Sequence, residues 1–304
     1  MKKVLITGGS GFIGRRLISF LEGRNHSIIL LSRSKQANYE TIICDFKTDL
    51  VPEEAFIGVD TVFHLAGLAH DTKESSKKIH LYEKINIDLT VQLAKLAIKN
   101  KVKSFIFVSS VKACGKGKKG NYLTENNQGD PEEIYGKTKR EAEVKLLQIC
   151  LNTDMHISII RPSLTYGPNV KGNLMLMMKG IRQGWLPPLP EINNKRTLIH
   201  VDDLVMALWL VANNDLANGE IFHVTDGKTY STREIYESMC FVLNKSVPNW
   251  IMPKIIFDIV SKFSPYFKNK IDKLLGDELY SSKKIESIGF KPKFTMKDMN
   301  EKIF

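Results

Sequence analysis

The stretch KVLITGGSGFIG, residues 3–14, decides the fold of this chain of 304 residues. Its first five residues are a largely apolar run typical of a buried strand, and apolar residues recur at helical spacing over residues 12–21. Glycines between them follow a GxxGxxG spacing, which permits a tight turn and lets the backbone approach a pyrophosphate. The stretch therefore predicts a strand, a turn and a helix whose N-terminus binds the phosphates of a dinucleotide. The predicted contacts are Gly8, Gly11, Phe12, Ile13 and Gly14.

Strand-like and helix-like segments continue to alternate over the first half of the chain. Strands that alternate with helices imply a parallel sheet with helices on both faces. We expect a Rossmann-type, doubly wound α/β fold for residues 1–164 and a smaller, mainly substrate-binding lobe for residues 165–304, from which residues 220–224 return to the sheet. The predicted strands are residues 27–31, 41–44, 59–65, 104–108 and 157–160, and the long helices are residues 82–98 and 132–150.

Composition excludes several other classes of protein. Apolar residues make up 43% of the chain, and the longest apolar run, residues 204–212, is far short of the ~18 residues of a membrane span. The N-terminus lacks the apolar core of a secretory signal, so we expect a cytoplasmic protein without stable membrane insertion. Four scattered cysteines form no CxxC pair and predict no metal site. The net charge of +11 comes without a nucleic-acid-binding motif, so we expect no nucleic-acid partner.

The end of the second predicted strand bears on which dinucleotide binds. A carboxylate there would hydrogen-bond the ribose hydroxyls of NAD, but the sequence has Ser32 and Arg33 instead. A guanidinium beside a hydroxyl suits the 2′-phosphate of NADP, so we favour NADP(H) and keep NAD(H) as the alternative, with Arg33 then stacked on the adenine. Later strand ends supply the other predicted contacts, which are Asp45 and Phe46 at the adenine and Leu65, Ala66 and Gly67 on the nicotinamide side.

Ser110, Tyr135 and Lys139 form the candidate catalytic group. Ser110 ends the fifth predicted strand, and Tyr135 and Lys139 are four residues apart, so they share one face of a helix. An ammonium near a phenol favours the phenolate, and we expect it to lower the pKa of Tyr135 from about 10 toward neutrality. Such a phenol exchanges a proton with a substrate hydroxyl or carbonyl while a nicotinamide exchanges the hydride.

Two segments of the second half carry further expectations. Ser231 and Glu234 fit a capping box, which predicts a helix from there to about residue 243. Residues 251–263 are amphipathic and basic, which is compatible with a helix on a membrane surface. We favour a lobe helix that buries Ile255, Ile259 and Phe263.

The chain resembles the extended short-chain dehydrogenase/reductase family, in its nucleotide-sugar epimerase/dehydratase branch. The resemblance rests on TGGSGFIG (7–14), HLAG (64–67), SSVKACG (109–115), YGKTK (135–139), RPSLTYGP (161–168) and RTLIHVDDL (196–204), which occur in the family's order. It implies that Ser110, Tyr135 and Lys139 are catalytic, that Tyr135 and Lys139 also contact the cofactor, and that a homodimer forms through the two long helices. The other implied contacts are Pro162 and Ser163 to the nicotinamide, Ser110 and Thr124 to the sugar, and Asn173 and Arg196 to the diphosphate of a UDP-sugar substrate, with Arg196 as a phosphate fork.

Departures from the family pattern narrow the chemistry. Members that dehydrate carry Asp-Glu directly after the catalytic serine or threonine, whereas this chain has Val111 and Lys112. We therefore lead with reduction of the 4-keto group of a UDP-4-keto-6-deoxy-N-acetylhexosamine, for surface-polysaccharide sugars. The alternative is a 4-epimerase of UDP-hexose or UDP-N-acetylhexosamine that keeps NAD tightly bound. A catalytically silent dinucleotide sensor is a third interpretation, which the complete Ser–Tyr–Lys group disfavours.

Overall fold

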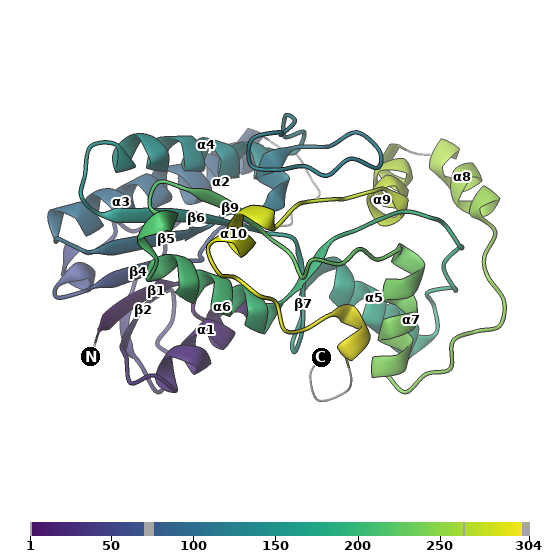
Figure 1. Cartoon of the computed structure of the whole chain (residues 1–304), viewed down its shortest axis with the longest axis horizontal. Helices are drawn as coiled ribbons and strands as arrows, with labels where there is room; N and C mark the ends of the chain where they lie inside the picture. Colours follow the sequence, from purple (N-terminus) through teal and green to yellow (C-terminus); the bar gives the residue numbers. More distant parts are fainter. Residues whose placement is uncertain (1, 70–75, 264, 300–304) are drawn as a thin grey trace.

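A computed structural model describes residues 2–69, 76–263 and 265–299, and Figure 1 shows two lobes side by side. The larger lobe is built on a seven-stranded sheet in the order β3-β2-β1-β4-β5-β6-β9, in which every neighbouring pair is parallel. The predicted Rossmann-type α/β fold is therefore confirmed. The strands are β1 (Lys3–Thr7), β2 (Ser27–Ser32), β3 (Glu40–Ile43), β4 (Thr61–His64), β5 (Ser104–Val108), β6 (His156–Pro162) and β9 (Ile221–Val224).

Helices cover both faces of this sheet because most of its strands are apolar on both sides. On one face, α1 (Phe12–Glu22) and α6 (Val201–Ala212) bury Leu17 and Leu208 against the strands. On the other face, α3 (Leu89–Lys99) and α4 (Ile134–Cys150) bury Leu93 and Leu146. The order of strands reverses between β1 and β4, and the crevice at such a reversal is where ligands bind in open α/β sheets.

The long helix expected over residues 82–98 contains an irregular turn. The helix α2 (Ser76–Glu83) leads into a π-helical turn, Lys84–Asp88, and only then into α3. Asn86 lies in this turn, and its buried side chain bonds both the N–H and the carbonyl of Leu68, at 2.8 and 3.1 Å. The π-helical turn therefore places Asn86 where it holds the loop after β4. Helical periodicity alone does not predict this contact.

The smaller lobe surrounds a separate apolar core that includes Tyr166, Leu189 and Met239. Its described elements are a two-stranded parallel sheet and four helices of ten residues or more. Although they belong to the second half of the chain, α6 and β9 lie on the main sheet. The small-lobe elements are β7 (Leu164–Tyr166), β8 (Leu198–His200), α5 (Gly172–Gln183), α7 (Thr232–Val242), α8 (Lys254–Phe263) and α9 (Pro265–Leu275); the short α10 (Lys283–Ser287) lies against β9.

Two expectations about small-lobe helices have opposite outcomes. The capping box is present, since Ser231 Oγ accepts from the Glu234 N–H at 3.0 Å and Glu234 Oε2 accepts from the Ser231 N–H at 2.7 Å. The expected burial of Ile255, Ile259 and Phe263 is wrong, because all three side chains of α8 are exposed. In the described parts of the chain, no helix is both long and apolar enough to span a bilayer.

Candidate active site

The glycine-rich turn packs directly on the end of β4. Gly8 has φ of +74°, and a Cβ placed there would stand 2.8 Å from the N atom of Ala66. A Cβ on Gly14 would stand 2.3 Å from the carbonyl oxygen of Gly8, so only glycine lets α1 approach the turn this closely. Thr7 Oγ1 fixes the same junction by accepting from the Ala66 N–H at 3.1 Å.

This turn fits a bound pyrophosphate. Gly11 is the N-cap of α1, and among the described residues no side chain caps the helix there. In any helix the N–H groups of the first turn, here those of Phe12, Ile13 and Gly14, have no partner within the helix. They form the positive end of the helix dipole. An anion placed there finds backbone donors and no side-chain competitor.

The strand ends beside the turn are polar and only partly buried. Ser32 ends β2, and Arg33 follows it with an exposed side chain. Asp45 Oδ1 accepts from the N–H of Lys47 at 3.0 Å, which holds the turn after β3. Phe46 packs on the edge of the apolar core beneath the sheet. These positions border the crevice on the side where the sequence places the adenine and its ribose.

Buried hydroxyls at two neighbouring strand ends also fit a polar ligand. Pro162 ends β6, and Ser163 follows it with its N–H donating to the Val224 carbonyl at 3.1 Å. The Oγ atoms of Ser109 and Ser163 are buried and find no hydrogen-bond partner among the described residues. Buried polar atoms are normally satisfied, so two orphans at these strand ends point to a group that a ligand supplies.

Ser110 lies beside Tyr135 and lowers the pKa of its phenol. Ser110 is the second residue after β5, it is extended, and its Oγ accepts from the N–H of Lys112 at 3.2 Å. Tyr135 lies in the first turn of α4, which runs close to the segment after β5. A Cβ on Gly136 would stand 2.4 Å from the carbonyl oxygen of Lys112, which explains the glycine after the tyrosine.

Lys139 lies one helical turn further along α4 and is buried. Its Nζ donates to the carbonyl oxygen of Val108 at 3.0 Å and stands 4.5 Å from the centre of the Phe107 ring. A Cβ on Gly67 would stand 3.0 Å from the same ammonium, so the loop after β4 passes directly over it. Burial lowers the pKa of Lys139 to about 8, and Glu143 opposes that shift.

The expected lowering of the tyrosine pKa toward neutrality is wrong in this structure. Burial raises the pKa of Tyr135 to about 12, and only the neighbouring Ser110 opposes that rise. Tyr82 and Glu143 raise the pKa further. The physical reason is that the ammonium of Lys139 donates to the Val108 carbonyl, while the phenol itself is desolvated.

Sequence reasoning missed two groups that hold this site. Asn86 Nδ2 donates to Thr138 Oγ1 at 3.0 Å, so this one side chain links α4 to the loop over Lys139. His64 bonds Thr7 through Nδ1 at 2.7 Å and Thr90 through Nε2 at 2.9 Å. Burial lowers the pKa of His64 far below its usual range, so this histidine is neutral. Only the HLAG motif drew attention to His64, and no sequence signal marked Asn86.

The loop between Ser110 and Tyr135 is tied to the edge of the sheet. Thr124 Oγ1 accepts from the N–H of Asn127 at 3.0 Å and shapes a local turn. Beside it, Glu125 Oε1 accepts from the N–H of His223 in β9 at 2.7 Å. Thr124 is partly buried, and the structure places it on the loop where the sequence expected a sugar contact.

Arg196 has internal partners. One Nη donates to the carbonyl of Lys273 at 2.5 Å, and the other donates to Glu278 Oε2 at 2.9 Å. Glu278 also forms an ion pair with Lys112, the second residue after Ser110. Both Nη atoms are thus engaged within the protein, whereas the buried Nε has no partner among the described residues. Asn173 lies exposed in the first turn of α5.

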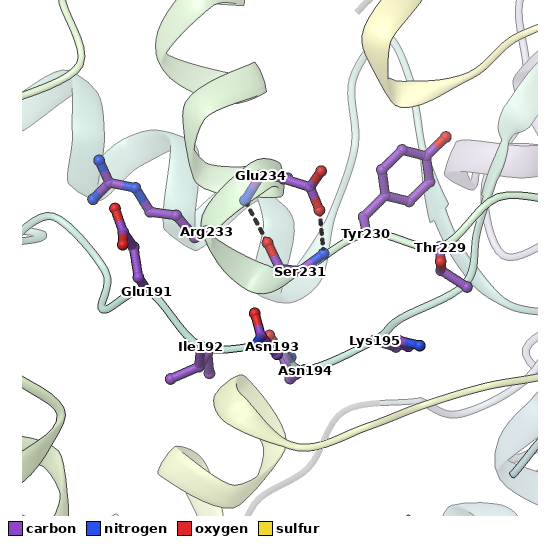
Figure 2. Close-up of a pocket in the computed structure, with 10 residues that line it drawn as sticks. All are labelled: Glu191, Ile192, Asn193, Asn194, Lys195, Thr229, Tyr230, Ser231, Arg233 and Glu234. Carbon is purple, nitrogen blue, oxygen red and sulfur yellow. Dashed lines mark hydrogen bonds between the residues drawn. The ribbon is translucent and has the colours of Figure 1, made fainter. Parts of the chain in front are cut away.

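A cavity of about 670 Å³ lies in the small lobe at the start of α7 (Figure 2). Its wall includes Tyr230, whose backbone pairs with that of Arg196 through hydrogen bonds of 2.9 Å. Ser110, Tyr135 and Lys139 do not line it. The described residues hold no cluster of three or more His, Cys, Asp or Glu side chains able to bind a metal ion. The cavity is lined by Glu191, Ile192, Asn193, Asn194, Lys195, Thr229, Tyr230, Ser231, Arg233 and Glu234.

Known proteins resemble this chain over nearly its whole length. A UDP-glucose 4-epimerase of Vibrio cholerae is 32% identical over 98% of this chain and 93% of its own length. An N-acetyl-alpha-D-glucosaminyl-diphospho-ditrans,octacis-undecaprenol 4-epimerase of Escherichia coli O157:H7 is 27% identical over 96% of this chain and 91% of its own. The solved UDP-glucose 4-epimerase of Thermotoga maritima shares the fold, with a TM-score of 0.78 at 20% identity over 97% of this chain and 95% of that one.

The match to a family is equally extensive. Residues 4–225 match the family described as NAD dependent epimerase/dehydratase, from the first strand to the end of β9. That segment contains the glycine-rich turn and the Ser–Tyr–Lys group together with the whole main sheet. The resemblance inferred from the motifs is thus confirmed, and the chain belongs to the NAD dependent epimerase/dehydratase family.

Proposed function

We propose that this protein is a nucleotide-sugar 4-epimerase that acts on a UDP-hexose or UDP-N-acetylhexosamine. The observation that carries the proposal is the grouping of Ser110 beside Tyr135, with Lys139 buried one turn further along α4. Two relatives that match more than nine-tenths of the chain are named as 4-epimerases, which supports this chemistry over reduction alone. The reductase with which the sequence interpretation led becomes the second candidate.

The chain's own residues would handle the proton of the sugar's 4-hydroxyl. Tyr135 would accept this proton when C4 is oxidised and return it when C4 is reduced, while Ser110 holds the same oxygen. A bound nicotinamide supplies reversible hydride transfer at C4. Lys139 would hold the Val108 carbonyl and the loop after β4 in place, and its positive charge would stabilise the phenolate while it exists.

The cofactor would lie across the crevice between β1 and β4. We assign its pyrophosphate to the turn from Gly8 to Gly14, where no side chain caps the N-terminus of α1. Its nicotinamide side would face Leu65, Ala66 and Gly67 together with Pro162 and Ser163. The diphosphate of the substrate would lie beside Arg196, with Asn173 and Thr124 as further contacts. The partners inside the lobe would hold the positive charge of Arg196 in place there.

A specific observation keeps the 4-ketoreductase as the second candidate. The end of β2 carries the exposed Arg33 where NAD-retaining epimerases would hold a carboxylate. A reductase oxidises one reduced dinucleotide for every 4-keto sugar that it reduces. An epimerase consumes none, because the hydride returns to the same carbon.

Product analysis without added reductant separates the two candidates. The purified protein is incubated with UDP-glucose or UDP-N-acetylglucosamine, and the products are followed by NMR. We expect the C4 epimer to accumulate to an equilibrium mixture without net change in absorbance at 340 nm. Failure to epimerise, together with stoichiometric NADPH oxidation by a UDP-4-keto sugar, would establish the reductase instead. Inactivity in both assays would reject the catalytic proposal.

The choice of dinucleotide is tested at Arg33. If its guanidinium binds a 2′-phosphate, Arg33→Asp should weaken NADPH binding by roughly tenfold to a hundredfold, because a charge-assisted hydrogen bond is replaced by repulsion. NADH binding should change little or improve. Fluorescence titration of both reduced dinucleotides measures this, with Arg24→Asp, an exposed arginine just beyond the end of α1, as the control. Equal losses for both dinucleotides would mean that Arg33 stacks on the adenine.

A further inference from the structure

The helix α8 turns its apolar face outward. On a helical projection, Ile255, Ile256, Ile259, Val260 and Phe263 fall within an arc of about 140°. All five are exposed; Phe263 is 82% and Ile255 is 64% accessible. The opposite side of the helix supplies Phe257, which packs on the small-lobe core. The helix is therefore anchored through one side and presents a continuous apolar strip to the exterior.

The strip continues into the segment before the helix and has a basic border. Trp250 is 57% exposed, and Ile251 is 40% exposed. Residues 244–273 contain six lysines against two aspartates. Lys262 is exposed beside the strip, while Lys254 pairs with Asp258 at 2.8 Å. Figure 1 shows α8 at the end of the small lobe, on the side away from the main sheet.

The size and charge of this face argue against a second copy of the chain as its occupant. A helix of ten residues is ~15 Å long and ~10 Å wide, so its face offers roughly 150 Å², far below the ~800 Å² that each partner buries in a standard interface. Pairing two copies through it would also bring two basic segments together. An anionic lipid bilayer requires no minimum interface area, because each apolar side chain inserts independently. It also avoids the repulsion between two basic segments, because the lysines meet opposite charge.

We propose that α8 and residues 250–251 dock this protein on an anionic lipid bilayer. The apolar side chains would enter the boundary between headgroups and acyl chains, and the lysines would contact the headgroups. The helix would lie in the plane of the membrane without crossing it. Because α8 lies on the side of the small lobe away from the main sheet, docking would keep the main sheet clear of the bilayer. On the proposed function, the enzyme would then work on substrates at the membrane surface.

Vesicle flotation with the full-length chain tests this surface. One set of vesicles contains phosphatidylcholine alone, and the other contains phosphatidylcholine mixed with phosphatidylglycerol. We expect the protein to float with the second set only and to be released as the salt concentration rises. Phe263→Glu should weaken this binding by about tenfold or more, and Lys262→Glu should weaken it less.

Matched variants exclude unfolding and unspecific adhesion. Leu151→Glu changes an equally exposed apolar side chain at the end of α4, and Lys291→Glu changes an exposed lysine outside the segment. Both should bind vesicles like the wild type, and circular dichroism should show the same fold for every variant. The proposal is overturned if neither vesicle binds or if Phe263→Glu binds as well as the wild type. It is also overturned if light scattering shows that Phe263→Glu dissociates a dimer of the wild type.

Discussion

The side chains of Tyr135 and Lys139 lie one helical turn apart yet have different partners. The phenol lies beside Ser110 and is desolvated, while the ammonium donates to the Val108 carbonyl. A pKa of about 12 keeps the phenol protonated at neutral pH, which is the form that donates a proton to a ketone oxygen. To accept a proton from an alcohol it must ionise, and a positive charge brought next to it would favour that.

Replacing the phenol alone tests this role. Tyr135→Phe keeps the ring that packs in the crevice and removes the hydroxyl, so turnover should fall by about 10²–10⁴-fold. Dinucleotide affinity should stay within a factor of about two, because no phosphate contact is lost. Turnover and fluorescence titration on the same preparation separate the two effects. A variant that kept full activity would remove Tyr135 from the mechanism.

At the scale of elements, α4 and β6 are joined by a buried ion pair that the motifs did not reveal. Glu143, one turn beyond Lys139, forms a bidentate pair with Arg161 at 2.6 and 2.9 Å, and both side chains are 1% exposed. Arg161 also donates to Gln128 in the loop between Ser110 and Tyr135, at 2.9 Å. One buried network thus joins α4, β6 and the loop between Ser110 and Tyr135.

Breaking this pair should destabilise the protein strongly. Glu143→Leu leaves the buried guanidinium uncompensated, so the free energy of unfolding should fall by about 3–5 kcal/mol. The double variant Glu143→Leu/Arg161→Leu should lose less than the sum of the two single variants. Denaturant unfolding measures each loss, with Glu141→Ala as the control, since its pair with Lys145 is exposed and is worth less than about 1 kcal/mol. Additive losses would show that the pair does not act as a unit.

Elements with a local signal were predictable, and elements defined by distant partners were not. The apolar runs gave the strands of the main sheet, and Ser231 with Glu234 gave the start of α7. The π-helical turn depends on what Asn86 bonds in a loop far along the chain. Likewise, periodicity revealed that α8 is amphipathic but not which face it buries, because Phe257 alone on the polar side contacts the core.

The same distinction holds within the site. Spacing placed Tyr135 and Lys139 on one face of α4, and the structure agrees. The pKa of the phenol depends on its burial and on where the ammonium is held. The four-residue spacing predicts neither of these. The resemblance implied Arg196 as a phosphate fork, but its carboxylate partner Glu278 lies more than eighty residues later and could not be predicted from the motif.

At the scale of the whole molecule, the two lobes meet through Glu278. This carboxylate joins Lys112, two residues after Ser110 in the large lobe, to Arg196 in the small lobe. The two cations lower its pKa although burial opposes them, so Glu278 is ionised at neutral pH. Together the three side chains carry a net positive charge at the junction, where the proposed substrate would place its diphosphate. The junction therefore links the small lobe to the segment that follows Ser110. The predicted homodimer and the cytoplasmic location stay predictions.

Removing the charge of Glu278 should loosen this junction without touching the cofactor crevice. In Glu278→Gln the two cations lose their shared carboxylate and repel one another, so the small lobe should become more accessible to protease. We expect KM for the UDP-sugar to rise several-fold, because Arg196 is no longer held in place, while dinucleotide affinity stays unchanged. Lys112→Met is the matched variant, since it removes one cation and leaves the pair of Arg196 with Glu278 intact at 2.9 Å. It should affect KM less and leave proteolysis near the wild-type rate. A Glu278→Gln protein with wild-type KM would show that the position of Arg196 does not depend on this carboxylate, and an equal loss of dinucleotide affinity would show that the junction supports both lobes alike.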